Sequence, residues 1–116
     1  WPSIIPTSGI SLRRKAMKNF FYLSKIKRFP HLEIDSRIVI FSYHYLNEMN
    51  LIKNKVTYYN IDDNGISSKY KKFSKLWWHK RLQAFTYLRY ILKKKNKCFI
   101  ISFDYIITSI ICRFLK

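Results

Sequence analysis

The clearest repeat of apolar and polar positions in this chain runs over residues 72–95. Apolar residues recur there at intervals of three or four, and basic residues occupy many of the positions between them. Ser74 stands near the start, where its hydroxyl can accept a hydrogen bond from the first helical turn. The pattern predicts a long helix with an apolar side, a basic side and a basic tail. Its apolar residues are Trp77, Trp78, Leu82, Phe85, Leu88, Ile91 and Leu92.

A second helical pattern lies near the start of the chain. Residues 1–10 contain two prolines and a glycine and have no period, which is typical of an extended arm. Helical spacing of apolar residues follows over 11–27, with Ser11 as the expected N-cap, and Pro30 ends the pattern. This segment is therefore expected to be a helix. Its apolar positions are Leu12, Ala16, Phe20 and Leu23.

The middle of the chain is rich in β-branched and aromatic residues. Residues 37–45 read Arg-Ile-Val-Ile-Phe-Ser-Tyr-His-Tyr, a composition that favours a strand. A short helix over about 46–53 and a second strand over 56–60 follow. The Asp-Asp-Asn-Gly sequence at 62–65 is a turn signal, because Asn-Gly readily adopts positive φ.

Two apolar runs end the chain. Residues 98–103 are interpreted as a buried strand, and residues 106–115 as either a helix or another strand, since period alone does not separate these for short runs. A chain of 116 residues has room for one domain. The expected fold class is therefore α/β: an extended basic N-terminal arm and helix over 1–30, then a small mixed α/β domain over 31–116.

The large positive charge of the chain indicates that this small domain binds a polyanion. The chain has 23 Lys and Arg against 6 Asp and Glu, a formal net charge of +17 and a pI near 10.1. Solubility needs a net charge of only about 2–8 for a small domain. Like charges oppose compaction, and nucleic acid would remove that repulsion while releasing its own counterions. We therefore expect a nucleic-acid partner.

Basic residues gather in groups along the chain, with aromatic residues between them. Phosphate contact needs only long cationic side chains, and aromatic rings can stack on unpaired bases. Tyr70 is the preferred stacking residue, whereas at least one of Trp77 and Trp78 is expected in the core. The predicted RNA-binding residues are Arg13, Arg14, Lys15, Lys18, Lys25, Lys27, Arg28, Lys69, Tyr70, Lys71, Lys72, Lys75, Lys80, Arg81, Lys93, Lys94, Lys95 and Lys97.

Catalytic chemistry has little support in the sequence. His31, His44 and His79 have no metal-ligand spacing, and with two glycines the chain contains no Gly-rich phosphate loop. Cys98 and Cys112 lie in apolar stretches and are interpreted as small buried hydrophobic residues. We predict a protein that is not an enzyme, with no metal, no cofactor and no small-molecule substrate.

In its size, its charge and its proline-bearing start, the chain resembles organellar ribosomal proteins as a class. The segment Trp78-His79-Lys80-Arg81-Leu82 is similar to the His-Lys-Arg-Leu stretch of the small-subunit family numbered ten in bacteria. The absence of a helix-turn-helix, zinc-finger or basic-zipper pattern favours RNA over DNA. The resemblance implies a structural constituent of a mitochondrial or other organellar ribosome. Its partners would be rRNA and neighbouring ribosomal proteins.

Two alternatives remain open. From 56 to 115 the predicted order of elements, with Phe99-Ile100-Ile101-Ser102-Phe103-Asp104 as a strand, resembles the N-terminal Rossmann-like half-domain of glycosyltransferases. The other alternative is a basic accessory subunit on a membrane surface, held there by an amphipathic helix over 72–95. No uncharged apolar stretch reaches the roughly 18–20 residues that a membrane-spanning helix needs.

Overall fold

The structure is a computed structural model that describes residues 9–50 and 70–115. All regular secondary structure in these two segments is helical, so the predicted α/β fold class is wrong for the part of the chain that is described. The elements are α1 (Arg14–Ser24), a 3₁₀ turn (Ile26–Arg28), α2 (Ile34–Phe41), a π-helical segment (Ser42–Leu46), α3 (Lys75–Lys94) and α4 (Phe103–Phe114).

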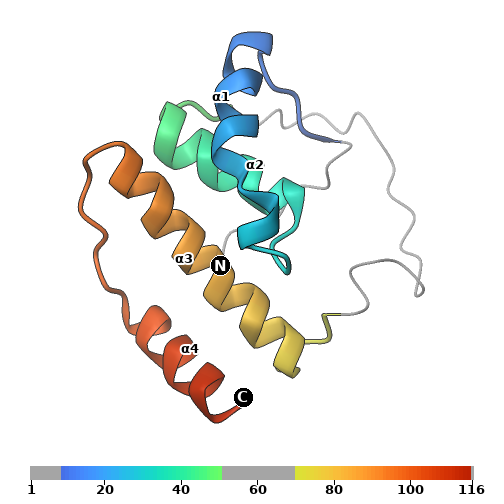
Figure 1. Cartoon of the computed structure of the whole chain (residues 1–116), viewed down its shortest axis with the longest axis vertical. Coiled ribbons are helices and arrows are strands. Elements are labelled where there is room, and N and C mark those ends of the chain that lie inside the picture. Colours follow the sequence, from blue (N-terminus) through green and yellow to red (C-terminus); the bar gives the residue numbers. More distant parts are fainter. Residues whose placement is uncertain (1–8, 51–69, 116) are drawn as a thin grey trace.

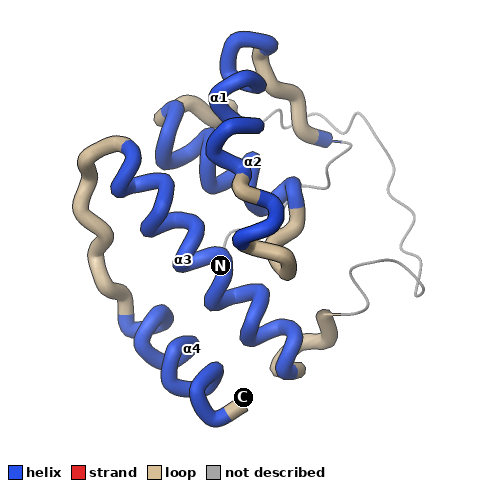
Figure 2. The backbone as a smooth tube through the Cα atoms, in the orientation of Figure 1, coloured by secondary structure: helices blue, strands red, loops and turns tan. Residues whose placement is uncertain are grey.

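Helix α3 is the central element of this arrangement (Figure 1). α1 and α2 lie on one side of it, and α4 runs along the other side. α3 contacts α2, the π-helical segment and α4, while α1 contacts α2. Figure 2 shows the same path with its long connection between α3 and α4. The core therefore lies between α3 and the pair formed by α1 and α2.

Aromatic side chains from three helices meet in that core. The Phe20 ring of α1 lies 5.5 Å from the Phe41 ring of α2, and Phe29 lies 5.3 Å from Tyr87 of α3, both edge-on. Burying a side chain of this size contributes roughly 1.5–3 kcal/mol relative to leaving it exposed. α1 is thus packed into the same core as the helices that follow it. The cluster consists of Phe20, Leu23, Phe29, Leu32, Ile38, Phe41, Ala84, Tyr87 and Ile91.

The long helix predicted over 72–95 is confirmed as α3. Ser74 is its N-cap, and the Ser74 hydroxyl accepts a hydrogen bond from the Trp77 N–H at 3.2 Å. At the other end, Asn96 adopts a left-handed conformation (φ 54°). The turned chain brings the Lys97 N–H within 2.9 Å of the Leu92 carbonyl, which satisfies an acceptor of the last turn.

The N-terminal helix is shorter than predicted. α1 begins at Arg14 instead of near Ser11, and Arg13 is an N-cap that makes no side-chain capping bond. It ends at Ser24 because Lys25 is left-handed (φ 44°), after which the chain forms the 3₁₀ turn. The predicted cap at Ser11 is therefore wrong.

The strand predicted over 37–45 is also wrong, because this run forms α2 and the π-helical segment. β-propensity reflects how a residue fits a half-buried pleated surface, and packing overrides it when a helix buries the same side chains. Ile38 and Phe41 are one helical turn apart and both face the core. The helix expected over 46–53 does not form in its described residues, since Asn47 (φ 57°) ends the π-helical segment.

Residues 98–102 form an extended connection with no strand partner in the described chain, so the buried strand predicted over 98–103 is wrong. Ile100 is 86% exposed, and Cys98, expected to be buried, is also exposed. An apolar run becomes a strand only where a neighbouring strand satisfies its backbone, and no strand is present in residues 9–50 or 70–115.

The last apolar run is a helix, which decides between the two alternatives left open for 106–115. α4 begins at Phe103, where the Ser102 hydroxyl caps it by accepting from the Tyr105 N–H at 3.3 Å. Cys112 on this helix is buried, as predicted. The strand predicted over 56–60 and the turn at 62–65 lie outside the described residues.

Candidate nucleic-acid interface

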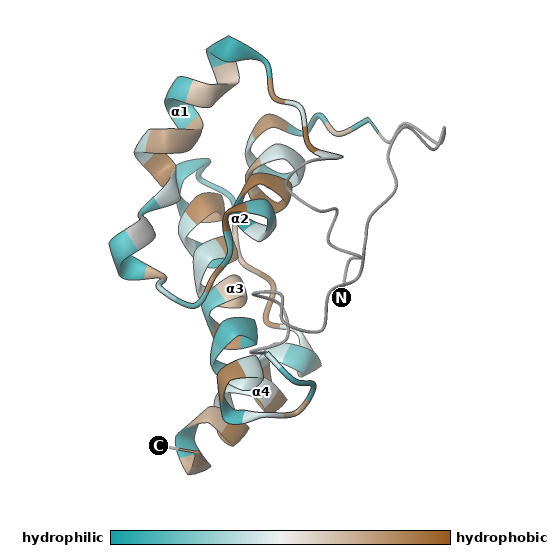
Figure 3. Cartoon of the chain, turned by 90° about the vertical axis from the view of Figure 1, so that its right-hand side faces the viewer, coloured by the Kyte–Doolittle hydropathy of each residue, from teal (hydrophilic) through white to brown (hydrophobic). Residues whose placement is uncertain are grey.

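The first basic group lies at the N-terminal end of α1, which projects beyond the other helices in two perpendicular views (Figures 1 and 3). The first turn of α1 contains no acidic residue, and the N-cap supplies no side-chain acceptor. Cations at a helix N-terminus oppose the helix dipole. An anion bound here would gain from both the side chains and the free backbone N–H groups. The exposed cations of this group are Arg13, Arg14, Lys15 and Lys18.

A second group lies at the C-terminal end of α1 and in the 3₁₀ turn that follows it, and aromatic rings contact its cations. The Lys25 ammonium lies 4.9 Å from the centre of the Tyr22 ring. The Arg28 guanidinium lies 5.6 Å from the Phe29 ring and 5.5 Å from the Tyr90 ring. Burial raises the pKa of Tyr90, with Tyr22 adding to the rise and Arg28 opposing it. Lys27, predicted with this group, is exposed beside them.

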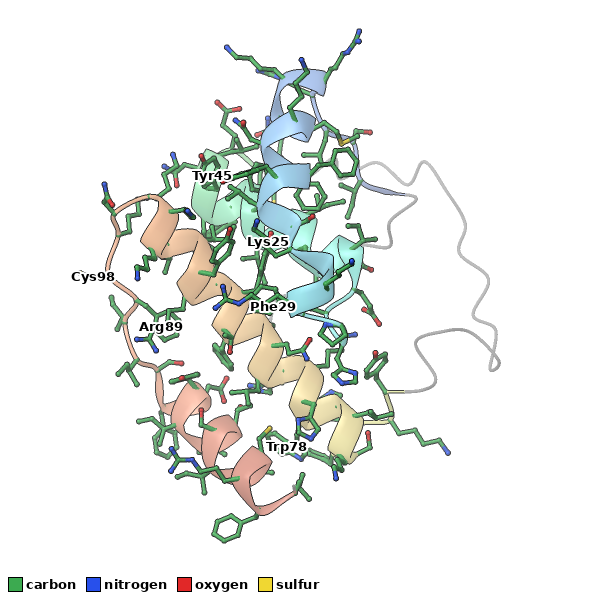
Figure 4. All side chains as sticks on the ribbon, viewed as in Figure 1. Lys25, Phe29, Tyr45, Trp78, Arg89 and Cys98 are labelled. Atoms are coloured by element: carbon green, nitrogen blue, oxygen red, sulfur yellow. The ribbon has the colours of Figure 1, made fainter. Side chains whose placement is uncertain are left out.

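The third group occupies the C-terminal end of α3, where cations agree with the helix dipole. The Lys95 ammonium lies 4.9 Å from the Tyr45 ring, and the Lys97 ammonium donates to the Asn47 side-chain oxygen at 3.3 Å. Figure 4 shows Tyr45 at this end of α3. Burial, assisted by Lys97, lowers the pKa of His44. All four cations are exposed, and they are Lys93, Lys94, Lys95 and Lys97.

The fourth group precedes and begins α3, at the opposite end from Tyr45. Lys71, Lys72 and Lys75 are exposed and form no ion pair within the described chain. Tyr70, the preferred stacking residue, is half-buried, and the Lys80 ammonium lies 4.7 Å from its ring centre. Lys69, predicted with this group, lies outside the described residues.

Two of the predicted RNA-binding residues are engaged in contacts between elements. The Lys80 ammonium forms an ion pair with Glu33 at 2.6 Å, which ties α3 to the segment before α2. The Arg81 guanidinium contacts Asp104 at 2.5 Å and the Thr108 hydroxyl at 3.2 Å, which ties α3 to α4. These two side chains therefore join α3 to its neighbouring elements.

Sequence reasoning missed Arg37, whose side chain is 2% exposed. Its guanidinium donates to the carbonyls of Ser24 (2.9 Å), Phe29 and Leu32 (2.9 Å and 2.6 Å), all in the segment from the end of α1 to the start of α2. Burial lowers its pKa, and the nearby Tyr87 opposes that effect. The only sequence signal is an arginine inside the apolar run that α2 buries.

An exposed apolar stripe on α4 was also missed. α4 packs one face on α3, and the residues of its other face recur at helical spacing. Figure 3 shows the apolar character of this helix at the end of the molecule remote from α1. Two apolar residues of the preceding connection are exposed as well, Ile100 and Ile101. The stripe consists of Phe103 (77% exposed), Ile106 (44%), Ile110 (49%) and Phe114 (86%).

No cluster of His, Cys, Asp and Glu suited to a metal ion occurs among residues 9–50 and 70–115. Across the same segments, no helix has both the length and the apolar composition to cross a membrane. The rings of His31 and His79 are stacked with their centres 6.2 Å apart, and the His31 N–H donates to the Gln83 side chain at 2.8 Å. This pair joins α3 to the loop before α2.

Comparison of the chain with protein-family models, with curated proteins and with solved structures found no match.

Proposed function

We propose that this protein is a structural constituent of an organellar ribosome that binds rRNA through its basic groups and contacts neighbouring ribosomal proteins. The observation that carries the proposal is the projecting N-terminal end of α1. Its cations are exposed, lack acidic partners in the described chain and oppose the local helix dipole. A surface of this kind is stabilised by a polyanion and destabilised without one.

The distribution of charge supports contact with several segments of a folded RNA at once. Basic groups lie at both ends of α1 and at both ends of α3, so they project in different directions from one small helical core. A protein wedged between RNA segments needs cations on several sides. The exposed apolar stripe of α4 would then be covered by a neighbouring protein, since a soluble monomer rarely leaves such a surface open. The proposal includes no reaction, cofactor or small-molecule substrate.

The test of RNA binding is the salt dependence of affinity, measured by fluorescence anisotropy with a labelled structured RNA. Each phosphate neutralised contributes about −0.9 for a duplex, or −0.7 for a single strand, to the slope of log affinity against log salt. Replacing all four cations of the α1 group by Gln should make the slope shallower by up to about 3.6 on a duplex or about 2.8 on a single strand. Replacing the exposed Arg89 and Arg113, which lie outside the basic groups, is the control, and it removes two cations against the four of the α1 group. A flat salt response of the unmodified protein would refute the electrostatic account.

The test of the ribosomal assignment is sedimentation from the native source. The protein should move with large ribonucleoprotein particles through a sucrose gradient and be released by ribonuclease. A mutated chain that lacks the four α1 cations should shift toward the top of the gradient after a high-salt wash. Sedimentation as a free small protein in low salt would contradict the proposal.

The glycosyltransferase resemblance has no support in the described fold. It implied a strand over 99–104 in a Rossmann-like sheet, whereas α4 begins at Phe103 and the residues before it have no strand partner in the described chain. We therefore do not retain it.

A membrane-surface protein remains as the second candidate, because of the apolar stripe of α4. Lipid contact through the amphipathic helix expected over residues 72–95 does not fit the packing of α3, whose Ala84, Tyr87 and Ile91 are buried in the core. A basic protein with an exposed apolar helix face can bind anionic lipid through both features. Flotation with phosphatidylserine vesicles distinguishes the candidates, since the ribosomal protein should not float once RNA is supplied in excess.

A further inference from the structure

An exposed aromatic cluster surrounds the N-terminal end of α3. The Phe73 ring lies 5.4 Å from the Trp77 ring and 6.2 Å from the Trp78 ring. The two tryptophan rings meet edge-on at 4.7 Å. Phe73 is 64% exposed, while both tryptophans are half-buried. Figure 4 places Trp78 at the end of α3 opposite Tyr45. The cluster therefore combines two partly buried tryptophan rings with one exposed phenylalanine ring.

The backbone presents Phe73 in an unusual way. Its φ of 66° lies in the left-handed region, which a bulky residue seldom occupies. The following residue, Ser74, caps α3, so the turn directs the chain into the helix while the Phe73 ring stays largely outside the core. The Phe73 ring is thus far more accessible than the core rings of Phe20 and Phe41, which are 1% and 0% exposed.

Two cations lie beside the rings of this cluster, and one of them, Arg81, is paired with Asp104. The Lys72 ammonium lies 5.3 Å from the Phe73 ring centre, and the Arg81 guanidinium lies 5.3 Å from the Trp77 ring. Lys71 and Lys75 are exposed, and the first turn of α3 contains no acidic residue. Positive charge beside the exposed Phe73 ring matches the chemistry of single-stranded nucleic acid, which offers phosphate and unstacked bases together. A duplex offers the phosphates alone, because its bases are already stacked on one another.

We infer that Phe73, with Trp77 and Trp78 beside it, forms a stacking site for unpaired bases of a single-stranded RNA segment, with Lys71, Lys72 and Lys75 against its phosphates. This inference rests on the proposed RNA-binding function and adds which RNA structure this end of α3 recognises.

The inference can be tested with tryptophan fluorescence in the full chain. Replacing Trp1 by Phe leaves Trp77 and Trp78 as the emitting residues. Titration with an unstructured oligouridylate should quench their emission, because a base stacked on the cluster quenches indole fluorescence. A hairpin duplex of similar length should bind with little quenching.

Substitutions at Phe73 separate stacking from other roles of the ring. Base–aromatic stacking is worth about 1–3 kcal/mol per base, so Phe73→Ala should weaken oligouridylate binding about 5- to 150-fold and leave duplex affinity within about twofold. Phe73→Leu should weaken it similarly, whereas Phe73→Tyr should retain it. Phe103→Ala is the matched control, because Phe103 is 77% exposed on α4. Far-UV circular dichroism checks that each variant folds.

The outcomes distinguish this inference from the function on which it rests. If Phe73→Ala binds oligouridylate as tightly as the unmodified chain while loss of the α1 cations weakens RNA binding, the stacking site is wrong and the proposed function stands. If the unmodified chain binds no RNA at low salt, both are wrong. A blue shift on anionic vesicles with no response to RNA would assign the cluster to a membrane surface and overturn the inference.

Discussion

Replacing Arg37 by Met should destabilise the protein more than any substitution of an exposed basic residue. The guanidinium is buried with no carboxylate partner in the described chain, and it donates to three backbone carbonyls instead. Those carbonyls belong to Ser24, at the end of α1, and to Phe29 and Leu32, in the segment that leads to α2. Arg37 thus holds together a stretch of irregular backbone between two helices.

The expected loss can be worked from these contacts. Met approximates the length of the arginine stem but donates nothing, so the Ser24 and Leu32 carbonyls lose the guanidinium as their donor. The Phe29 carbonyl still accepts from the Leu32 N–H at 3.1 Å. Each unsatisfied buried group costs about 1–3 kcal/mol, and hydrogen bonds to charged donors are at the upper end. Part of this loss in the free energy of unfolding is offset, because Met has no charge that must be desolvated on folding. A net loss of about 3–5 kcal/mol is expected, a large share of the stability of a small domain.

The assay is urea unfolding of RNA-free protein, followed by circular dichroism at moderate salt so that charge repulsion is screened. Arg37→Lys tests geometry, since an ammonium cannot reach three carbonyls from one position and should recover little of the loss. Arg89→Met is the control, because Arg89 is exposed on α3 and its loss should change stability by less than about 0.5 kcal/mol. A difference between Arg37→Met and this control of under about 1 kcal/mol would refute the reasoning.

Four further predictions concern three other buried or capping groups, Tyr87, His44 and Ser74. The Tyr87 hydroxyl is buried and has no hydrogen-bond partner within residues 9–50 and 70–115, so Tyr87→Phe should leave the free energy of unfolding unchanged or raise it by up to about 1–3 kcal/mol, and a clear loss would contradict this. Burial also raises the pKa of Tyr87, and Arg37 partly opposes that rise. Above about pH 10 the unfolded chain loses this proton while the folded chain keeps it, so the unmodified protein loses stability. The stability of Tyr87→Phe should therefore fall less steeply above about pH 10 than that of the unmodified protein. Burial and Lys97 lower the pKa of His44. The stability that neutral His44 contributes is therefore complete above about pH 6.5 and is lost as the pH falls. The melting temperature of His44→Gln should drop less on acidification than that of the unmodified chain. Ser74→Ala removes the N-cap of α3 and should cost about 1 kcal/mol in urea unfolding, with Ser109→Ala, which caps no helix, as its comparison.

Sequence reasoning succeeded where a long period and a cap agreed. α3 could be predicted because its apolar residues repeat over several turns and Ser74 marks the start. It failed over residues 37–45, where β-branched and aromatic residues predicted a strand. That run is short, and its conformation depends on partners far away in sequence: the α3 residues Tyr87 and Ile91 share the core with Ile38 and Phe41.

The candidate site could be predicted in composition but not in arrangement. A list of cations identifies residues that can contact phosphate, and most of those described are exposed. It does not reveal that Lys80 and Arg81 pair with Glu33 and Asp104, since those partners lie 47 and 23 positions away. Nor does it reveal that Tyr70 is half-buried while Phe73 is exposed, which depends on the left-handed turn at Phe73.

The helix ends connect stability to function. Both α1 and α3 begin without an acidic residue in the first turn and with cations there instead, Arg14 and Lys15 in α1 and Lys75 in α3. Each arrangement opposes the helix dipole, and the net charge of +17 adds a general repulsion. A ligand that binds the folded chain stabilises it by mass action, and a polyanion at these ends would also reverse an unfavourable interaction. Salt should therefore have opposite effects, raising the stability of the free protein by screening its charges while lowering its affinity for RNA. The same cations that weaken the isolated fold would then make that fold depend on its RNA partner.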